Sequence, residues 1–352
     1  MMQAFVCATR LYFGENALQV LSTLQIRRAM LVTDGFFVKN GTVARILSLM
    51  PEAETELFSQ VQPDPPLGLV AQGVGLLQKW KPDTIIALGG GSAIDCAKGI
   101  LAMGGIDSRL IAIPTTSGTG SEVTSFAILS HEGTKHPLVE DALRPEIAIL
   151  DASLLQQLPQ SLVADAGMDV LAHCLEALAA KNASVFTDAL ATWAFSKVLK
   201  HLQESFAGDL KVREEIHLAA TMAGIAFDNG GLGICHSLAH SIGGSFHIAH
   251  GRLNGILLPH VIAFNAQTNP ESYTKLAGYC GLHGVRGLCF ALTRLRKQLK
   301  LPGSLTEAGL SREEVLQKEE CLCRAALEDP CTATNPRPID RKAMGQLLRG
   351  AL

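Results

Sequence analysis

The sequence predicts two halves, a parallel α/β domain over residues 1–155 and an all-helical domain over residues 156–352. In the first half, short β-branched runs alternate with amphipathic stretches, whereas after Asp151 long stretches rich in Ala and Leu take over. A length of 352 residues with 47% hydrophobic side chains is enough for two cores, although a single barrel would also fit the length. We therefore expect one core in each half.

The elements of the first half follow in order along the chain. Apolar runs predict strands over 29–34, 83–91 and 109–116, and a helical pattern over 92–103 lies between the last two strands. Strands that alternate with helices form a parallel sheet, and such sheets bind ligands at the carboxyl ends of their strands. We therefore expect a ligand site where these strands end.

The second half has helical patterns that are interrupted by proline and by pairs of glycines. Pro159, Gly230–Gly231, Gly243–Gly244 and Pro259 are the main breaks. The sequence contains no internal repeat and no linker rich in Ser or Pro. We therefore expect the two halves to pack directly on each other, with the active site in a cleft between them.

The bulk composition excludes several classes of partner. The net charge is −3, from 30 basic and 33 acidic side chains, and aromatic residues make up 5%, which does not favour a nucleic-acid surface. The first residues do not have the pattern of a secretion signal, and no window offers about 18 uninterrupted apolar residues. Nine cysteines without paired spacing fit a reducing compartment. These features predict a cytoplasmic protein with a small-molecule partner, no nucleic acid and no membrane.

Four residues of the second half have the types and spacing of a metal site. Asp169 and His173 are four residues apart, as are His236 and His240, so each pair projects from one face of a helix. One carboxylate and three imidazoles would hold a divalent metal and leave a coordination position open. The four predicted ligands are Asp169, His173, His236 and His250. Any one of these histidines alone would be read as an ordinary buried residue, but the repeated spacing and the flanking glycines favour a site.

A glycine-rich turn follows the strand over 83–91. Gly89, Gly90 and Gly91 would let backbone N–H groups approach a pyrophosphate, and the next helix would add its positive N-terminal end. The alternative is a tight turn with no ligand, since the motif is neither of the common phosphate-binding patterns. Asp95 and Lys98 further along this helix are open to interpretation as a solvated face.

Two further segments support a dinucleotide site. Asp34 ends the strand over 29–34, where a carboxylate can accept ribose hydroxyls and would repel a 2′-phosphate, favouring NAD over NADP. A helix or turn cap explains Asp34 equally well. The segment IPTTSGTGSEVT over 113–124 offers many small hydroxyl donors, although such loops are often only loops. Together with the glycine turn, these segments predict dinucleotide binding.

With these motifs in view, the sequence resembles the iron-containing (group III) alcohol dehydrogenases over essentially its whole length. The matching stretches are GGGSAIDCAK, IPTTSGTGSEVT, RPEIAILD, GMDVLAHCLEA, GLGICHSLAHSIGGSFHIAHGRLNGILLPHVIAFN and ALEDPCTATNPRP. Within the family it is most similar to the 1-propanol and ethanol dehydrogenases associated with bacterial microcompartments. The resemblance implies an α/β dinucleotide-binding domain, a helical metal-binding and substrate domain, and a homodimer.

The resemblance also implies roles for individual residues. Asp169, His173, His236 and His250 match the metal ligands, and His240 matches a histidine near the nicotinamide. The residues that match cofactor contacts are Asp34, Gly90, Gly91, Ser92, Thr115, Thr116, Thr119, Thr124, Lys135 and Leu154. Cys331 matches a residue that lines the substrate pocket.

The implied function is metal-dependent, NAD(H)-linked interconversion of short-chain primary alcohols and aldehydes, such as 1-propanol and propanal or ethanol and acetaldehyde. The metal would be Fe²⁺ by resemblance, with Zn²⁺ as the alternative because this ligand set also suits zinc. We interpret His240 as a catalytic residue that relays a proton through the nicotinamide ribose, because it lies one turn from His236.

Two other functions remain open at this point. One is a lyase or cyclase of the dehydroquinate synthase type, which uses NAD and a metal but needs a basic pocket; the metal-site segments contain no such cluster of Lys and Arg. The other is a low-activity structural member of an enzyme assembly. Ala166 and Ala172 stand where family members usually carry Thr, which would weaken the support of the metal ligands.

Overall fold

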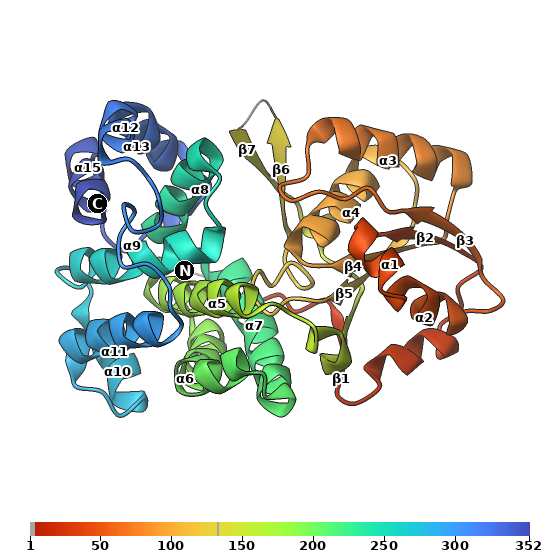
Figure 1. The fold of residues 1–352 in the computed structure, drawn as a ribbon, viewed down its shortest axis with the longest axis horizontal. Helices are drawn as coiled ribbons and strands as arrows, with labels where there is room; N and C mark the ends of the chain where they lie inside the picture. Colours follow the sequence, from red (N-terminus) through yellow and green to blue (C-terminus); the bar gives the residue numbers. More distant parts are fainter. Residues whose placement is uncertain (1–3, 132–133) are drawn as a thin grey trace. The chain divides into compact units, whose positions relative to one another are not determined.

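The computed structural model describes residues 4–131 and 134–352. The chain divides into two compact units, which Figure 1 labels element by element. One unit is Cys7–Leu158, and the other is Pro159–Leu352 together with the described residues before Cys7. The predicted fold class, an α/β domain followed by an all-helical domain, is confirmed. We describe each unit by itself.

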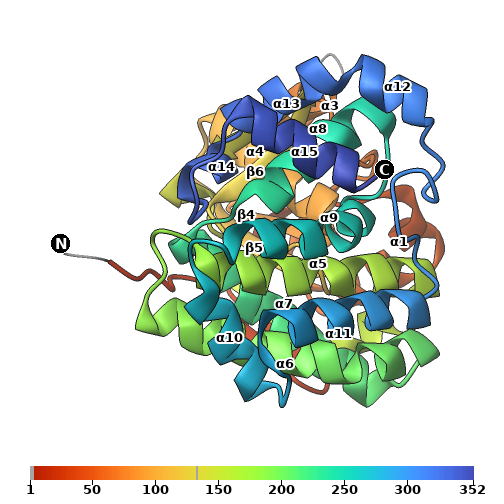
Figure 2. The same ribbon diagram turned by 90° about the vertical axis from the view of Figure 1, so that its left-hand side faces the viewer.

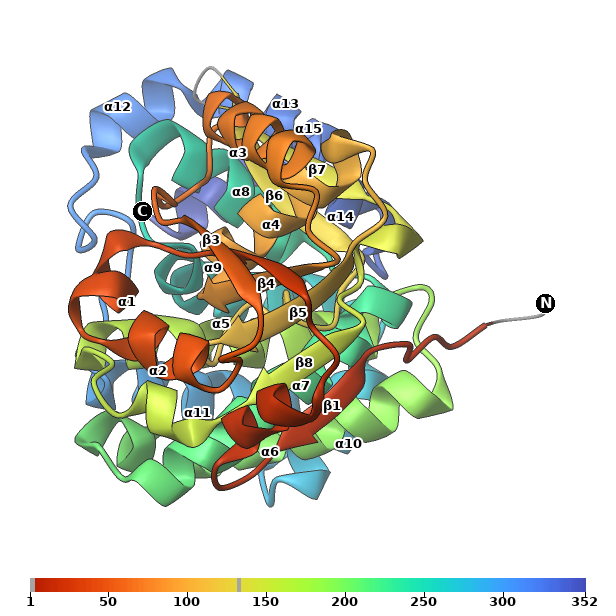
Figure 3. The same cartoon turned by 90° about the vertical axis from the view of Figure 1, so that its right-hand side faces the viewer.

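The first unit contains a six-stranded, fully parallel sheet with the strand order β1-β8-β5-β4-β2-β3 (Figure 3). Its strands are β1 (Arg10–Phe13), β2 (Arg28–Val32), β3 (Glu54–Phe58), β4 (Thr84–Gly89), β5 (Arg109–Pro114) and β8 (Ile147–Leu150). Neighbouring parallel strands cannot be joined by a short hairpin. The strands of this sheet are therefore joined by longer crossover connections that contain helices.

Helices cover both faces of this sheet, and the sequence of β4 shows why its apolar run is continuous. Ile85 packs into the core formed with α3 and α4, whereas its neighbour Ile86 packs into the core formed with η1 and α2 on the opposite face. Successive side chains of a strand point to opposite faces, so a strand covered on both sides is apolar at every position. The helical elements are η1 (Ala17–Thr23), α1 (Gly35–Lys39), α2 (Thr42–Ser48), α3 (Leu67–Trp80), α4 (Gly91–Gly104), η2 (Asp141–Leu143) and η3 (Ala152–Leu155).

A separate antiparallel hairpin, β6 (Phe126–His131) with β7 (Thr134–Val139), lies outside the main sheet. One edge of β6 pairs with β7. Two side chains of α4 bond the backbone of β6 and of the residues just before it. Lys98 Nζ donates to the carbonyls of Thr124 and Phe126, and the Asp95 carboxylate accepts from Ile128 N–H. The hairpin is therefore attached to α4 through buried polar side chains.

The second unit is helical in its described residues, and α5 is its central element (Figure 2). The sixteen residues Val163–Asp165 and Gly167–Ala179 of this helix are buried, and α5 packs against α6, α7 and α9. A helix that is covered on every side is apolar all round, which explains the Ala and Leu content of the segment. The helices are α5 (Gln160–Ala179), α6 (Val185–Ala207), α7 (Leu210–Gly230), α8 (Ile234–Phe246), α9 (His250–Asn265), α10 (Pro270–Tyr279), α11 (Gly284–Gln298), α12 (Arg312–Gln317), α13 (Glu319–Glu328), α14 (Pro330–Thr334) and α15 (Arg341–Gly350).

In the described part of the chain, no single helix has both the length and the apolar composition needed to cross a membrane. The pair α7 and α8 passes that test only jointly, and the two helices meet at a bend of 105°.

Candidate active site

The centre of the candidate site is one face of α5. Asp169 and His173 are buried on it one helical turn apart, and 4.0 Å separates the Asp169 Oδ1 atom from the His173 Nε2 atom. The His173 ring is stacked between Phe227 and His236, with ring centroids 4.4 and 4.6 Å away. Packing on both faces therefore fixes the direction of the imidazole.

Two more helices bring the other predicted ligands to Asp169. His236 lies in the first turn of α8 and His250 is the first residue of α9; their Nε2 atoms are 3.7 and 3.5 Å from Asp169 Oδ1. Gly251 makes the approach of α9 feasible, because a Cβ at this position would lie 1.9 Å from the Asp165 carbonyl oxygen of α5. The structure thus brings all four predicted ligands together.

The donor set fits a divalent metal ion. Ligand atoms that are each about 2.1 Å from one ion lie roughly 3.4 Å apart in a tetrahedral arrangement. The three imidazole nitrogens lie 3.5 to 4.0 Å from Asp169 Oδ1. The donor atoms of Asp169, His173 and His236 all lie within 4.8 Å of one another. One carboxylate with imidazole nitrogens is also a donor set that first-row metals accept.

Asn254, which the sequence did not single out, lies at the centre of this set. Its amide Nδ2 donates to Asp169 Oδ1 at 2.7 Å and is 3.3 Å from His236 Nε2 and 3.1 Å from His250 Nε2. One carboxylate oxygen and two ring nitrogens therefore surround a single amide nitrogen, which is an arrangement that a cation also requires. Asn254 is four residues after His250, and this helical spacing is a signal that could have identified it.

The charges of the site stabilise an ionised aspartate. Burial opposes ionisation of Asp169, but His173, His250 and His236 and the bond from Asn254 outweigh it and hold its pKa at about 2. Burial likewise disfavours the charged form of His236, yet Glu176 and Asp169 raise the pKa of this histidine above its ordinary value. Asp169 is thus held in its carboxylate form, which is the form that binds a cation.

A second group of polar side chains adjoins the four ligands. His240, Asp329 and Cys331 have donor atoms within 4.8 Å of one another, and His240 Nδ1 donates to Asp329 Oδ2 at 2.8 Å. The His240 ring stacks on that of His250, with centroids 5.0 Å apart. Burial opposes ionisation of Asp329, but its bond with His240 holds the pKa at about 2. Burial raises the pKa of the Cys331 thiol, so the thiol is neutral where it lies beside His240 and Asp329.

In the α/β unit, the predicted cofactor residues of two loops lie against each other. A Cβ on Gly90 would meet Thr116 Oγ1 at 3.1 Å, and a Cβ on Gly91 would meet Thr119 Cγ2 at 2.8 Å. Gly89 ends β4 with a φ of 150°, and its carbonyl accepts from Thr115 N–H. The turn between β4 and α4 is therefore packed directly on the hydroxyl loop. The helix begins at Gly91, one residue before the predicted helical pattern over 92–103, with Ser92 in its first turn.

The other predicted cofactor residues already have protein partners. Asp34 caps α1 by accepting from Phe36 N–H, so the interpretation of Asp34 as a helix cap is confirmed as a structural role. Lys135 on β7 forms an ion pair of 2.6 Å with Asp64. Thr124 is buried, and its Oγ1 atom accepts from Lys98 Nζ at 3.2 Å. Leu154 lies in η3 and packs against the core beneath the sheet.

Two interpretations of α4 residues are corrected by the structure. Asp95 and Lys98 were open to interpretation as a solvated face, but Asp95 is buried and Lys98 is fully buried. Burial raises the pKa of Asp95 despite the nearby charge of Lys98. The helical period alone could not reveal this, because the backbone groups that these two side chains bond belong to Thr124, Phe126 and Ile128, far along the chain.

Comparison with known families and proteins matches both halves of the chain. A sequence model described as iron-containing alcohol dehydrogenase matches residues 8–152, and one described as the Fe-containing alcohol dehydrogenase family, C-terminal, matches residues 163–352. The chain is 39% identical to a 1-propanol dehydrogenase of Citrobacter freundii, with 100% of both chains covered. It is 37% identical to an NADPH-dependent butanol dehydrogenase of Clostridium saccharobutylicum, with 98% of this chain and 97% of that protein covered.

Solved structures agree with these matches. An iron-containing alcohol dehydrogenase from Thermococcus thioreducens superposes with a TM-score of 0.95 at 30% identity, over 99% of each chain. A sulfoacetaldehyde reductase from Bifidobacterium kashiwanohense, solved in complex with NAD⁺, has a TM-score of 0.90 at 25% identity over 100% of this chain and 99% of that chain. Sequence matches and superposed folds therefore agree on one assignment: the chain belongs to the iron-containing alcohol dehydrogenase family and is an alcohol dehydrogenase, an oxidoreductase that interconverts alcohols and aldehydes.

Proposed function

We propose that this alcohol dehydrogenase interconverts short-chain primary alcohols and aldehydes with NAD(H) and a divalent metal held by Asp169, His173, His236 and His250. The observation that carries the proposal is the convergence of the three imidazole nitrogens within 4.0 Å of Asp169 Oδ1. Propanal and acetaldehyde are the proposed substrates for reduction, which accords with the similarity to a 1-propanol dehydrogenase.

When bound, the metal supplies a Lewis acid for the substrate oxygen and the dinucleotide supplies or accepts the hydride. The protein residues position these groups and handle the proton. Asp329 accepts the Nδ1–H of His240, so that the Nε2 atom of this ring is the site that can accept or donate a proton. We assign the catalytic role to His240 on this ground. Cys331, buried beside Asp329, is the proposed lining of the substrate pocket.

For the cofactor, the packed loops of the α/β unit provide the proposed binding surface. Gly90, Gly91 and Ser92 at the start of α4 and the hydroxyls of Thr115, Thr116 and Thr119 are the proposed phosphate and nicotinamide contacts. Lys135, Thr124 and Leu154 are proposed to complete it. The N-terminal end of α4 favours an anion because its backbone N–H groups have no partner within the helix.

Asp34 is proposed to select NAD(H) over NADP(H), because a carboxylate repels a 2′-phosphate. One relative is named for its use of NADPH, so the selectivity of this chain needs its own test. Asp34→Ser keeps a side chain that can cap α1 but removes the charge. The variant should raise kcat/KM with NADPH relative to NADH by about tenfold, roughly 1.4 kcal/mol. An unchanged ratio would show that Asp34 is only a cap.

Fe²⁺ is the proposed metal, and metal analysis of protein purified without oxygen tests it. Iron that copurifies with activity, and is lost together with it on chelation, supports the proposal. Activity that returns with Zn²⁺ but not with Fe²⁺ would assign the site to zinc.

The substrate proposal is tested with aldehydes of two to four carbons. Net oxidation of NADH with propanal supports a dehydrogenase, since a cyclase that regenerates its cofactor oxidises none. A metal-loaded preparation without turnover on any of these aldehydes would favour the low-activity structural role. Four further points stay predictions. They are the homodimer, the location in the cytoplasm or inside a microcompartment, the domain boundary at residue 155 and the cleft between the two halves.

A further inference from the structure

Glu176 lies on the same face of α5 as the predicted metal ligands Asp169 and His173. Glu176 is seven residues after Asp169 and three after His173, so the three residues line up over two helical turns. Glu176 is buried, with 4% of its surface exposed. The predicted ligand set does not include Glu176, and an isolated buried carboxylate is costly unless its oxygens are bonded.

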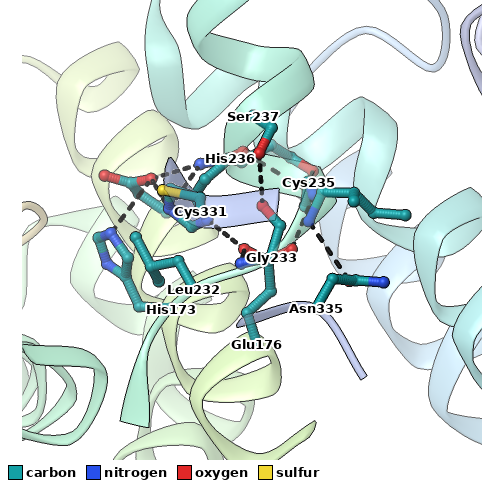
Figure 4. A network of polar contacts seen from close by, with 12 residues as sticks. His173, Glu176, Leu232, Gly233, Cys235, His236, Ser237, Cys331 and Asn335 are labelled. Atoms are coloured by element: carbon teal, nitrogen blue, oxygen red, sulfur yellow. Dashed lines mark hydrogen bonds and ion pairs between the residues drawn. The ribbon is translucent and has the colours of Figure 1, made fainter. Parts of the chain in front are cut away.

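Its two oxygens accept three hydrogen bonds, all from the start of α8 (Figure 4). The Oε2 atom accepts from Gly233 N–H at 2.9 Å and from His236 Nδ1 at 2.6 Å, and the Oε1 atom accepts from Cys235 N–H at 2.7 Å. One side chain of α5 therefore bonds the backbone at the N-terminus of α8 and the imidazole one position further along.

Glycine at position 233 makes this approach feasible. A Cβ there would lie 2.7 Å from Glu176 Oε1 and 2.9 Å from Asn335 Oδ1, which is closer than real Cβ contacts. The N-terminus of α8 also carries the partial positive charge of the helix, which stabilises an ionised carboxylate. Both observations indicate a site built for the Glu176 carboxylate.

The bond to His236 has a chemical consequence. A carboxylate is acceptor-only, so Nδ1 carries the proton and the lone pair of the neutral ring is on Nε2. This Nε2 atom is the one that lies 3.7 Å from Asp169 Oδ1. We infer that Glu176 is a positioning residue that holds His236 in its Nε2-binding tautomer and sets the position of α8 relative to Asp169. The inference rests on the proposed metal site and adds a residue that acts on the metal through His236.

A purely structural role for Glu176 is the competing explanation, and Asn335 provides a matched control. Asn335 is also fully buried at the start of α8, where its Oδ1 atom accepts from Ile234 N–H at 3.4 Å and from Asn265 Nδ2 at 2.9 Å. Asn335→Ala therefore removes buried hydrogen bonds at the same helix end while leaving the bond between Glu176 and His236.

The experiment measures Co²⁺ affinity of the metal-free full-length protein by competition with a chromophoric chelator, together with the visible spectrum of the Co²⁺ complex. Glu176→Gln keeps the shape but places an amide NH₂ among three N–H donors. Such a change should weaken Co²⁺ binding by about 10- to 100-fold and alter the spectrum. Asn335→Ala should lower the melting temperature with a change in affinity of less than about threefold and a wild-type spectrum.

A second readout reports the tautomer directly. In metal-free protein labelled with ¹⁵N-histidine, the His236 signal, assigned by its loss in His236→Gln, should show a protonated Nδ1 in the wild type and a mixture in Glu176→Gln. Wild-type affinity, spectrum and tautomer in Glu176→Gln would overturn the inference. So would a loss of affinity in Asn335→Ala equal to that in Glu176→Gln.

Two further variants keep the outcomes separate. If Glu176→Gln does not fold, Glu176→Asp, which retains the charge on a shorter side chain, should weaken Co²⁺ binding measurably, and wild-type affinity would contradict the inference. Asp169→Asn should abolish binding. If Asp169→Asn binds Co²⁺ like the wild type, the proposed metal site is wrong and the inference fails with it. If Asp169→Asn loses Co²⁺ binding while Glu176→Gln binds Co²⁺ like the wild type, the metal site is supported and only the inference about Glu176 fails.

Discussion

The two units build their proposed binding surfaces from different chemical material. In the α/β unit the surface consists of backbone and small hydroxyl side chains at strand ends, where Gly90 and Gly91 leave room for Thr116 and Thr119. In the helical unit it consists of large side chains from three helices that meet at Asp169, buried except for the half-buried His250. A substitution that adds side-chain atoms should therefore weaken cofactor binding in the α/β unit, whereas a substitution that removes a donor atom should weaken metal binding in the helical unit.

The largest effect is expected in the helical unit. Asp169→Asn removes the only carboxylate among the four predicted ligands, and loss of a Lewis acid worth several kcal/mol lowers kcat/KM by about 10³-fold or more. Metal content should fall with activity, while NADH affinity measured by fluorescence titration should stay within about twofold. A variant that keeps its metal and its activity would contradict the ligand assignment.

Lys98→Met tests the buried polar link between α4 and the β6–β7 hairpin. The substitution leaves the Thr124 and Phe126 carbonyls without the donor that now binds them, so the free energy of unfolding should fall by about 3 kcal/mol. NADH affinity should fall as well, because the loop before β6 loses its attachment. Lys79 is an exposed residue of α3, so Lys79→Met is the control and should change stability by less than about 0.5 kcal/mol. Equal stability of the two variants would show that Lys98 is dispensable.

Gly91→Ala tests the rule that added atoms damage the α/β surface. The new Cβ would lie 2.8 Å from Thr119, and overpacking of this kind costs about 1 to 3 kcal/mol. NADH affinity should fall by roughly tenfold, with metal content unchanged. Gly75→Ala on α3 is the control, since a Cβ there would meet no atom within 4 Å in the described part of the chain. If both variants bind NADH equally, the close packing of the two loops does not matter for the cofactor.

The smallest effect concerns pH. The folded-state pKa of Asp329, about 2, lies below the ordinary value of about 3.9, so the aspartate contributes stability above pH 4 that is lost as the pH falls towards 2. The contribution is at most about 2.7 kcal/mol, because the pKa lies about 1.9 below the ordinary value and one pKa unit corresponds to about 1.4 kcal/mol. Asp329→Asn should be less stable than the wild type at pH 6, and the two unfolding curves should converge between pH 5 and pH 2. Parallel curves over that range would contradict the depressed pKa.

Much of this architecture follows from local patterns in the sequence. The continuous apolar runs predict buried parallel strands, and the spacing of Asp169 and His173 predicts that they share a helix face; both predictions are confirmed. The family assignment, which rests on six ordered motifs, is confirmed as well. These features are visible because each depends on residues that are close together in the chain.

Other features could not be read from spacing. Asp95 and Lys98 have the separation expected of a solvated helix face, yet they bond the backbone between Thr124 and Ile128. Asp34 is predicted as a ribose ligand, and the structure shows it as the cap of α1. A helical period states which residues share a face and leaves open which distant segment will cover that face.

By itself, the sequence determined the types of donor atom, the helices that carry them and the small residues that permit close approach. Only the tertiary structure decided that α5, α8 and α9 meet at Asp169, that Asn254 lies among their donors and that Glu176 is bonded to His236. The physical reason is that backbone geometry sets a side chain's direction within its own helix, whereas its partners depend on how separate helices pack.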